Sequence, residues 1–172
     1  MDVLTRPPGS AIILWCVALV VFILLQLAMR ARIFNGARFL ETRLRGYSAA
    51  EVHEFLKAIG PLGAPWYIVL QVFDVAFIVS FAGAMLQTDR WSLARMATSG
   101  NAVQWITWLP PVYAVLDLTE NLTLAGLVVV QRRSDALSRL ASLSTRAKAV
   151  SGVASLIATI AVVLSSLLPV AH

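Results

Sequence analysis

Tyr113-Ala-Val-Leu-Asp117-Leu-Thr-Glu120-Asn121 lies in the middle of an apolar run from Trp105 to Val130. On a helix, residues three and four apart share a face, so the four polar side chains form one stripe. A charged group near the centre of a bilayer costs roughly 2.5 to 3.5 kcal/mol and usually faces a cavity or a partner. The stripe is therefore predicted to point into a helix bundle and to form part of a functional site.

The composition of the whole chain supports a membrane location. The sequence is 59% hydrophobic and 13% charged, with a mean hydropathy of +0.78, against roughly 45 to 50% apolar and about 25% charged residues in soluble domains. Four segments are long enough to cross a bilayer, at about 11–29, 66–86, 105–130 and 149–170. We expect an all-α polytopic membrane protein, with residues 1–172 forming a single domain built on a four-transmembrane-helix bundle.

The basic residues set the expected orientation. The net charge is +5 and the pI is about 10.1, but eleven of the fourteen Lys and Arg residues fall in two connections, so a membrane topology signal is preferred over a nucleic-acid partner. The predicted cytoplasmic loops are 30–65 and 131–148, and both termini are predicted to be non-cytoplasmic in a cell inner or plasma membrane. The basic residues concerned are Arg30, Arg32, Arg38, Arg43, Arg45 and Lys57, then Arg132, Arg133, Arg139, Arg146 and Lys148.

The first connection contains the clearest local helix signal. Ser48-Ala-Ala-Glu51 is a capping box, which predicts a short amphipathic helix from Ala49 to Ile59. Gly60 is placed to end that helix in a left-handed conformation. The segment Gly60-Pro-Leu-Gly-Ala-Pro65 is then predicted to be a stiff turn that returns the chain to the membrane.

Two later segments carry weaker signals. Between 87 and 104, Thr88-Asp89-Arg90-Trp91 and Ser99-Gly100-Asn101 have the chemistry of turns and caps, and a connecting loop is predicted there. In the last span, Ser151, Ser155 and Thr159 are spaced i, i+4 and i+8. Small residues at this spacing let helices approach closely, so packing is preferred over a substrate path.

The second span carries a polar stripe of its own. Tyr67, Gln71 and Asp74 are spaced i, i+4 and i+7, which places them on one helical face. Because spans two and three are antiparallel neighbours, Asp74 is expected to meet the Glu120 and Asn121 face at a similar depth. The predicted ligand-binding residues are Asp74, Asp117, Glu120, Asn121, Tyr113, Gln71 and Tyr67.

Three carboxyl groups in a low dielectric cannot all stay ionised, and no Lys, Arg or His lies within any predicted span. Protons, a bound cation, or a cationic or hydroxyl-bearing ligand would offset the electrostatic cost of burying the three groups. Oxygen ligands would suit Mg²⁺, Ca²⁺ or Mn²⁺ better than zinc, copper or haem. Cys16 is the only cysteine, which excludes a cysteine-rich metal site; no cofactor is expected, and no residue is assigned as a metal ligand.

Three functions stay open at this point. The first is binding of a proton, a cation or a small amphiphilic ligand by the carboxylate cluster. The second is a structural or assembly role in which the polar stripe fixes helix packing. The third is an intramembrane acid/base enzyme acting on a lipid or sterol-like substrate, with one carboxyl group as proton donor and another as base. The expected partners are the lipid bilayer, a small-molecule, lipid or cation ligand, and a second copy or another membrane protein, with no nucleic acid.

The order of several motifs resembles a group of small four-span membrane proteins that have no assigned activity. The similarity covers about Gly46 to Leu122, under half of the chain. The group usually has an arginine after the second glycine of its glycine motif, where this chain has Ala64-Pro65. The matching residues are Tyr47-Ser-x-x-Glu51, Gly60-x-x-Gly63-x-x-x-Tyr67 with Asp74 seven residues later, and Asp117-x-x-Glu120-Asn121. The resemblance implies a role for these positions but no chemistry.

Overall fold

The computed structural model describes residues 8–34, 39–96, 104–130 and 134–167. These residues form four long helices and two short 3-10 helices, η2 (Leu40–Thr42) and η3 (Trp105–Trp108), and no strand is found among them. The long helices are α1 (Gly9–Arg32), α2 (Ala49–Arg95), α4 (Leu109–Val130) and α5 (Asp135–Leu167). All four are long and apolar enough to cross a membrane, so the predicted all-α four-helix membrane bundle is confirmed.

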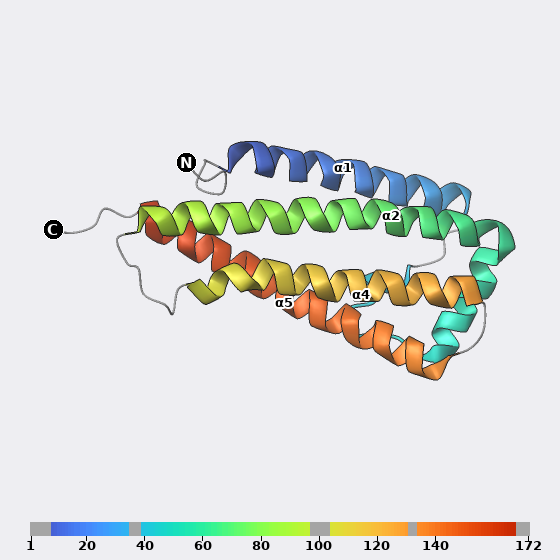
Figure 1. Ribbon diagram of the computed structural model, residues 1–172. Helices are drawn as coiled ribbons and strands as arrows, with labels where there is room; N and C mark the ends of the chain where they lie inside the picture. Colours follow the sequence, from blue (N-terminus) through green and yellow to red (C-terminus); the bar gives the residue numbers. More distant parts are fainter. Residues whose placement is uncertain (1–7, 35–38, 97–103, 131–133, 168–172) are drawn as a thin grey trace.

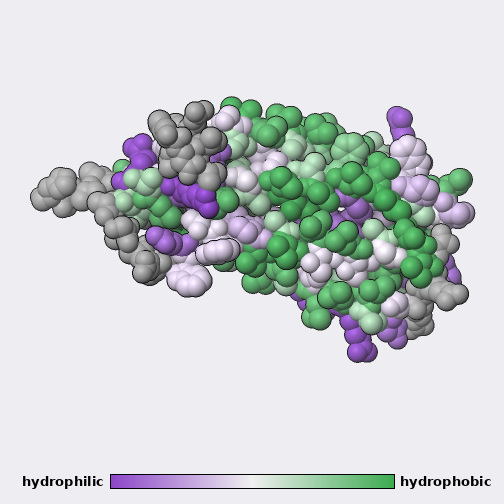
Figure 2. Space-filling view, viewed as in Figure 1, coloured by the Kyte–Doolittle hydropathy of each residue, from purple (hydrophilic) through white to green (hydrophobic). Residues whose placement is uncertain are grey.

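The long helices lie side by side, and α1 begins at the same end of the bundle at which α5 ends (Figure 1). Figure 2 shows hydrophobic side chains over most of the middle of the molecule and hydrophilic ones mainly toward its two ends. The chain is a multi-pass membrane protein. Which side of the membrane each end faces stays a prediction. Some of the residues on which that prediction rests lie outside the described residues, namely Arg38, Arg132, Arg133 and the two termini.

The break at Gly60 divides α2 into two parts. Ser48 and Glu51 form the predicted capping box, with the Ser48 backbone N–H donating to Glu51 Oε2 at 2.8 Å and the Glu51 N–H donating to Ser48 Oγ at 3.3 Å. Gly60 has φ 61° and ψ −177°, a combination that essentially only glycine adopts. The 49–59 part therefore turns away from the axis and lies across the ends of α4 and α5 (Figure 1).

The apolar core lies at this end of the bundle. Tyr67 is fully buried at its centre, with ring centroids 6.3 Å from Phe34, 6.2 Å from Phe39 and 5.1 Å from Phe55. These three phenylalanines come from the connection after α1 and from the 49–59 part of α2. The predicted amphipathic helix thus buries its apolar face against the bundle.

The second span is longer than predicted. Pro61 follows the break at once, where a helix start tolerates proline because its missing N–H has no helical partner, and the helix then runs to Arg95 instead of ending near residue 86. The turn expected at Thr88-Asp89-Arg90-Trp91 is wrong. Thr88 Oγ1 donates to the Ala84 carbonyl at 2.7 Å within the helix, and Asp89 is buried. The predicted Ser99-Gly100-Asn101 turn lies outside the described residues.

The fourth helix also begins earlier than predicted. The expected loop 131–148 is helical from Asp135 onward, and α5 continues to Leu167. Ser134 starts the helix, its Oγ accepting from the Leu137 N–H at 3.3 Å and its carbonyl from the Ser138 N–H at 3.0 Å. Hydropathy alone hid this start because the first turns bury small residues instead of large apolar ones. The buried residues of these turns are Ser138, Ala141, Ser142, Ser144 and Thr145.

The strained backbone at Gly60 gives a first prediction. Gly60→Ala should destabilise the protein by about 1 to 3 kcal/mol, because a side chain disfavours this conformation. A Cβ there would meet no atom within 4 Å, so the whole effect comes from the backbone. Thermal unfolding in detergent measures the loss of stability. The matched control is Gly126→Ala, because Gly126 lies within a helix and a Cβ there also meets no atom within 4 Å. Equal melting temperatures for the two variants would show that the break does not need glycine.

Candidate functional site

The polar stripe of α4 faces inward as predicted. Asp117, Glu120 and Asn121 have exposed fractions of 2%, 0% and 2%. The opposite face of the helix is apolar and exposed, through Val115, Leu118, Leu122 and Val129. Tyr113 lies one turn further along the stripe, and its hydroxyl donates to Asp117 Oδ2 at 2.7 Å. The acidic side chains of α4 are therefore enclosed by the other helices.

The stripe of α2 meets this face where the depth estimate places it. Asn121 Nδ2 donates to Asp74 Oδ2 at 2.8 Å, which joins α4 to α2. Gln71, one turn before Asp74, is 5% exposed. The Gln71 Oε1 and Asn121 Oδ1 atoms are buried without a hydrogen-bond partner. Two amide oxygens beside Asp74 are thus able to accept hydrogen bonds.

Tyr67 shares a helix face with Gln71 and Asp74 but contributes its ring to the aromatic core described above. The 3.6-residue period predicted its face correctly. It could not predict that Phe34 and Phe39, which precede Tyr67 by about thirty residues, would surround the ring. The Tyr67 ring is therefore part of the aromatic core.

Lys148 corrects the expectation that no basic residue lies within a span. Its Nζ lies 2.6 Å from Asp117 Oδ1 and 2.5 Å from Glu120 Oε2, and its side chain is 14% exposed. The predicted loop 131–148 had placed this lysine outside the membrane as a topology signal. Because α5 begins at Asp135, Lys148 instead lies thirteen residues into the helix, roughly 20 Å from its start.

A signal for Lys148 was present in the sequence. Ala141, Thr145, Lys148, Gly152 and Ser155 follow one another at spacings of four, three, four and three residues, the pattern of a single buried helix face. The small residues in this series let α5 approach α4 closely. At Gly152, an added Cβ would lie 3.1 Å from the Tyr113 ring. Lys148 therefore lies in the interface between α4 and α5, because the residues before and after it on the same helix face are small.

Thr145 and Tyr47 extend the network toward the 49–59 part of α2. The Thr145 hydroxyl makes a short contact with Glu120 Oε1 and lies 3.3 Å from the Tyr47 hydroxyl. The Tyr47 backbone N–H donates to Ser142 Oγ at 2.9 Å. Neither Thr145 nor Tyr47 was among the predicted site residues, although Tyr47 belongs to the motif that carries the family resemblance.

The charges of this network do not balance. We call Asp74, Asp117, Glu120 and Lys148, with Tyr113, Asn121 and Thr145, the Lys148 cluster. The cluster has three carboxyl groups and one ammonium group, which pairs with Asp117 and Glu120, and within the described ranges no other Lys or Arg forms an ion pair with these acids. With every group ionised the cluster would carry a formal charge of −2. In the same part of the chain, no three Asp, Glu, His or Cys side chains are grouped to hold a metal ion.

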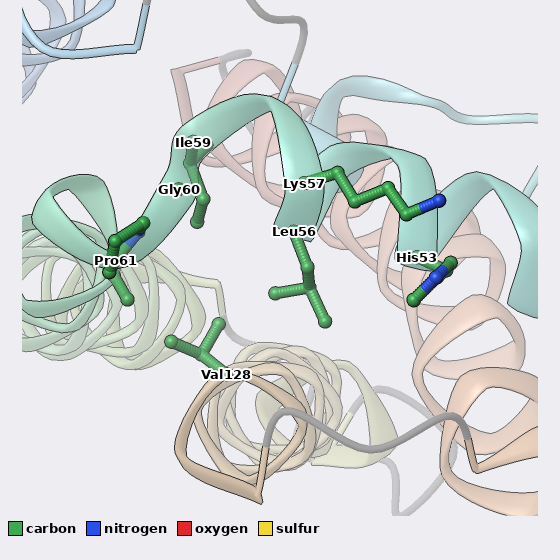
Figure 3. A pocket seen from close by; sticks show the side chains of 8 residues that line it. His53, Leu56, Lys57, Ile59, Gly60, Pro61 and Val128 are labelled. Atoms are coloured by element: carbon green, nitrogen blue, oxygen red, sulfur yellow. The ribbon is translucent and has the colours of Figure 1, made fainter.

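A separate cavity of about 390 Å³ lies at the break in α2, away from the Lys148 cluster. Figure 3 shows Leu56 and Val128 bordering this hollow, with Lys57 and His53 on the 49–59 part of α2. None of the predicted ligand-binding residues lines it. The predicted site and this cavity are therefore different places.

Comparison with known proteins gives no name to this arrangement. The chain matches no family model, no curated protein and no solved structure. The chemistry of the site has to be argued from its geometry.

The Lys148 ion pairs give a second prediction. Lys148→Met should destabilise the protein by about 3 to 5 kcal/mol, because it leaves two buried carboxyl groups without their cation. Unfolding in detergent measures the loss, with exposed Lys57→Met as the matched control. Adding Asp117→Asn and Glu120→Gln to Lys148→Met should recover part of the stability. If Lys148→Met unfolds like the control, the ion pairs do not hold the bundle together.

Proposed function

We propose that this integral membrane protein binds a proton inside its helix bundle, at Asp74 in the Lys148 cluster. The observation that carries the proposal is the excess of carboxyl groups, three against one ammonium group. An unpaired charge is costly in a low dielectric, and a buried acid avoids that cost by keeping its proton.

The contacts favour Asp74 as the acid that takes the proton. Asp117 and Glu120 each contact the Lys148 ammonium group and a hydroxyl group. Asp74 instead accepts a hydrogen bond from the neutral amide of Asn121, and Lys148 forms its ion pairs with the other two acids. A negative charge on Asp74 is therefore compensated least, so protonation there relieves the most electrostatic cost.

The surroundings of Asp74 also suit a protonated group. A carboxylic acid gains a donor that a carboxylate lacks, and the Gln71 Oε1 and Asn121 Oδ1 atoms nearby are buried acceptors without a partner. An ammonium or hydroxyl group of a small amphiphilic ligand would offer the same donors. Asp74 is 9% exposed, more than Asp117 or Glu120, which makes it the side of the cluster open to exchange.

A structural role is the second candidate, and a different observation favours it. Lys148, Asp117, Glu120, Thr145 and Tyr113 are joined by ion pairs and hydrogen bonds across the α4 and α5 interface, although Glu120 Oε2 contacts Lys148 without a hydrogen bond of ordinary geometry. Such a network fixes the register of two helices whether or not a ligand binds. An intramembrane enzyme has less support, because both α4 carboxyl groups are held by Lys148. A second copy or a partner membrane protein stays a prediction.

Infrared spectroscopy of the protein in lipid tests the proton at Asp74. The wild type should show the carbonyl band of a buried protonated carboxyl group at neutral pH, and Asp74→Asn should remove it. Asp135→Asn, in the first turn of α5 outside the cluster, should leave the band unchanged. A wild type without the band, or an Asp74→Asn variant that keeps it, would contradict the proposal. Asp117→Asn shows whether the band instead belongs to the ion-paired acids.

A further inference from the structure

A second buried carboxyl group lies near the opposite end of the bundle. Asp89 of α2 is fully buried, as is Ser92 one turn later, and Thr159 of α5 is 8% exposed. One turn before Asp89, the Ser155 hydroxyl of α5 donates to Met85 Sδ at 3.2 Å, which shows that the two helices are in contact here. Asp89 is therefore enclosed between α2 and α5, outside the Lys148 cluster.

No basic side chain neutralises Asp89. Within the described residues it forms no ion pair, in contrast to Asp117 and Glu120. The adjacent Arg90 is exposed, and the Arg95 guanidinium lies over the Trp91 ring, 4.9 Å from its centroid. The nearest arginines in the sequence are thus directed elsewhere. A buried carboxylate without a cation is costly unless it takes up a proton or a cation from outside the protein chain compensates it.

The oxygen atoms around Asp89 are also unsatisfied. Both Asp89 carboxyl oxygens, Ser92 Oγ and Thr159 Oγ1 are buried without a hydrogen bond of ordinary geometry, although the Thr159 hydroxyl faces the carboxyl group. Buried polar atoms in native proteins nearly always have a partner, so each exception calls for an explanation. The unsatisfied atoms of Asp89, Ser92 and Thr159 are all oxygens, which is the donor set of a hard cation. The Trp15 Nε1–H, which lines the cavity beside Thr159, is also buried without a partner.

We propose that a monovalent cation of the sodium type binds between α2 and α5, coordinated by the Asp89 carboxylate and by the Ser92 and Thr159 hydroxyl oxygens. One carboxylate balances one positive charge, so the occupied site is neutral. A divalent cation would leave a positive charge in a low dielectric, because Asp89 is the single acid among the three proposed ligands.

Access and space are consistent with a small ion. Asp89 lies six residues before the last residue of α2, roughly 9 Å along the axis, so the aqueous phase at that end is near. Thr159 also lines a cavity of about 170 Å³ bordered by Trp15 of α1.

Thermal unfolding of the full chain in detergent tests the site. The melting temperature of the wild type should rise by several degrees with NaCl, following a single-site saturation curve, and should not rise with choline chloride at equal ionic strength. Asp89→Asn keeps the shape of the side chain but removes its charge, so it should lose the response to sodium. Asp74→Asn is the control and should keep it, which separates this site from the proton at Asp74.

Two milder variants keep the test decisive if Asp89→Asn does not fold. Thr159→Val and Ser92→Ala each remove one oxygen ligand and should raise the sodium concentration at half-saturation by about tenfold. Broadening of the ²³Na resonance by the wild type, absent in these variants, provides an independent readout. Equal melting curves in sodium and choline would overturn the proposal, and so would an unchanged sodium response in all three variants. A protonated carboxyl band that is lost in Asp89→Asn and unaffected by sodium would also overturn it.

Discussion

The ion pairs of Lys148 with Asp117 and Glu120 are the constraint on which the arrangement of the bundle depends. Buried carboxylates are tolerated only where a cation and hydrogen bonds compensate them, so α4 has to turn its acidic face toward α5. Lys148 reaches both acids because they lie three residues apart on one helical face. The same face presents Asn121 to Asp74, and this hydrogen bond brings α2 against α4. One electrostatic requirement therefore positions three of the four long helices.

The small residues of α5 make this interface possible. Gly152 leaves room for the Tyr113 ring. The hydroxyl groups of Ser142 and Thr145 contact the Tyr47 backbone N–H and the Tyr47 hydroxyl, respectively. Gly46, at φ 81°, has no space for a side chain beside Arg146 and Ser142. The 49–59 part of α2 thus closes one end of the bundle through contacts with α5 as well as through the aromatic core around Tyr67.

The sequence predicted most where local periodicity decides the structure. The capping box at Ser48, the left-handed Gly60 and the inward face of α4 all follow from spacings of three or four residues. Lys148 and Asp89 were misplaced for one shared reason. Hydropathy ends a predicted span at its charged residues, whereas a helix continues through them when another helix buries or pairs them. The contacts of Tyr67 depend on phenylalanines distant in the chain, and no local pattern contains that information.

The peripheral helix α1 shows how the buried polar groups are protected from lipid. Its only buried residue among those described is Met29, so most of its surface faces outward. The Phe22 ring stacks on Phe77 of α2, and the Trp15 ring lies tilted to Phe77. The Lys148 cluster contains no side chain from α1, because α2, α4 and α5 supply all of its members. Trp15 nevertheless borders the cavity beside Thr159. This helix therefore covers the part of the α2 and α5 interface at which Thr159 lies.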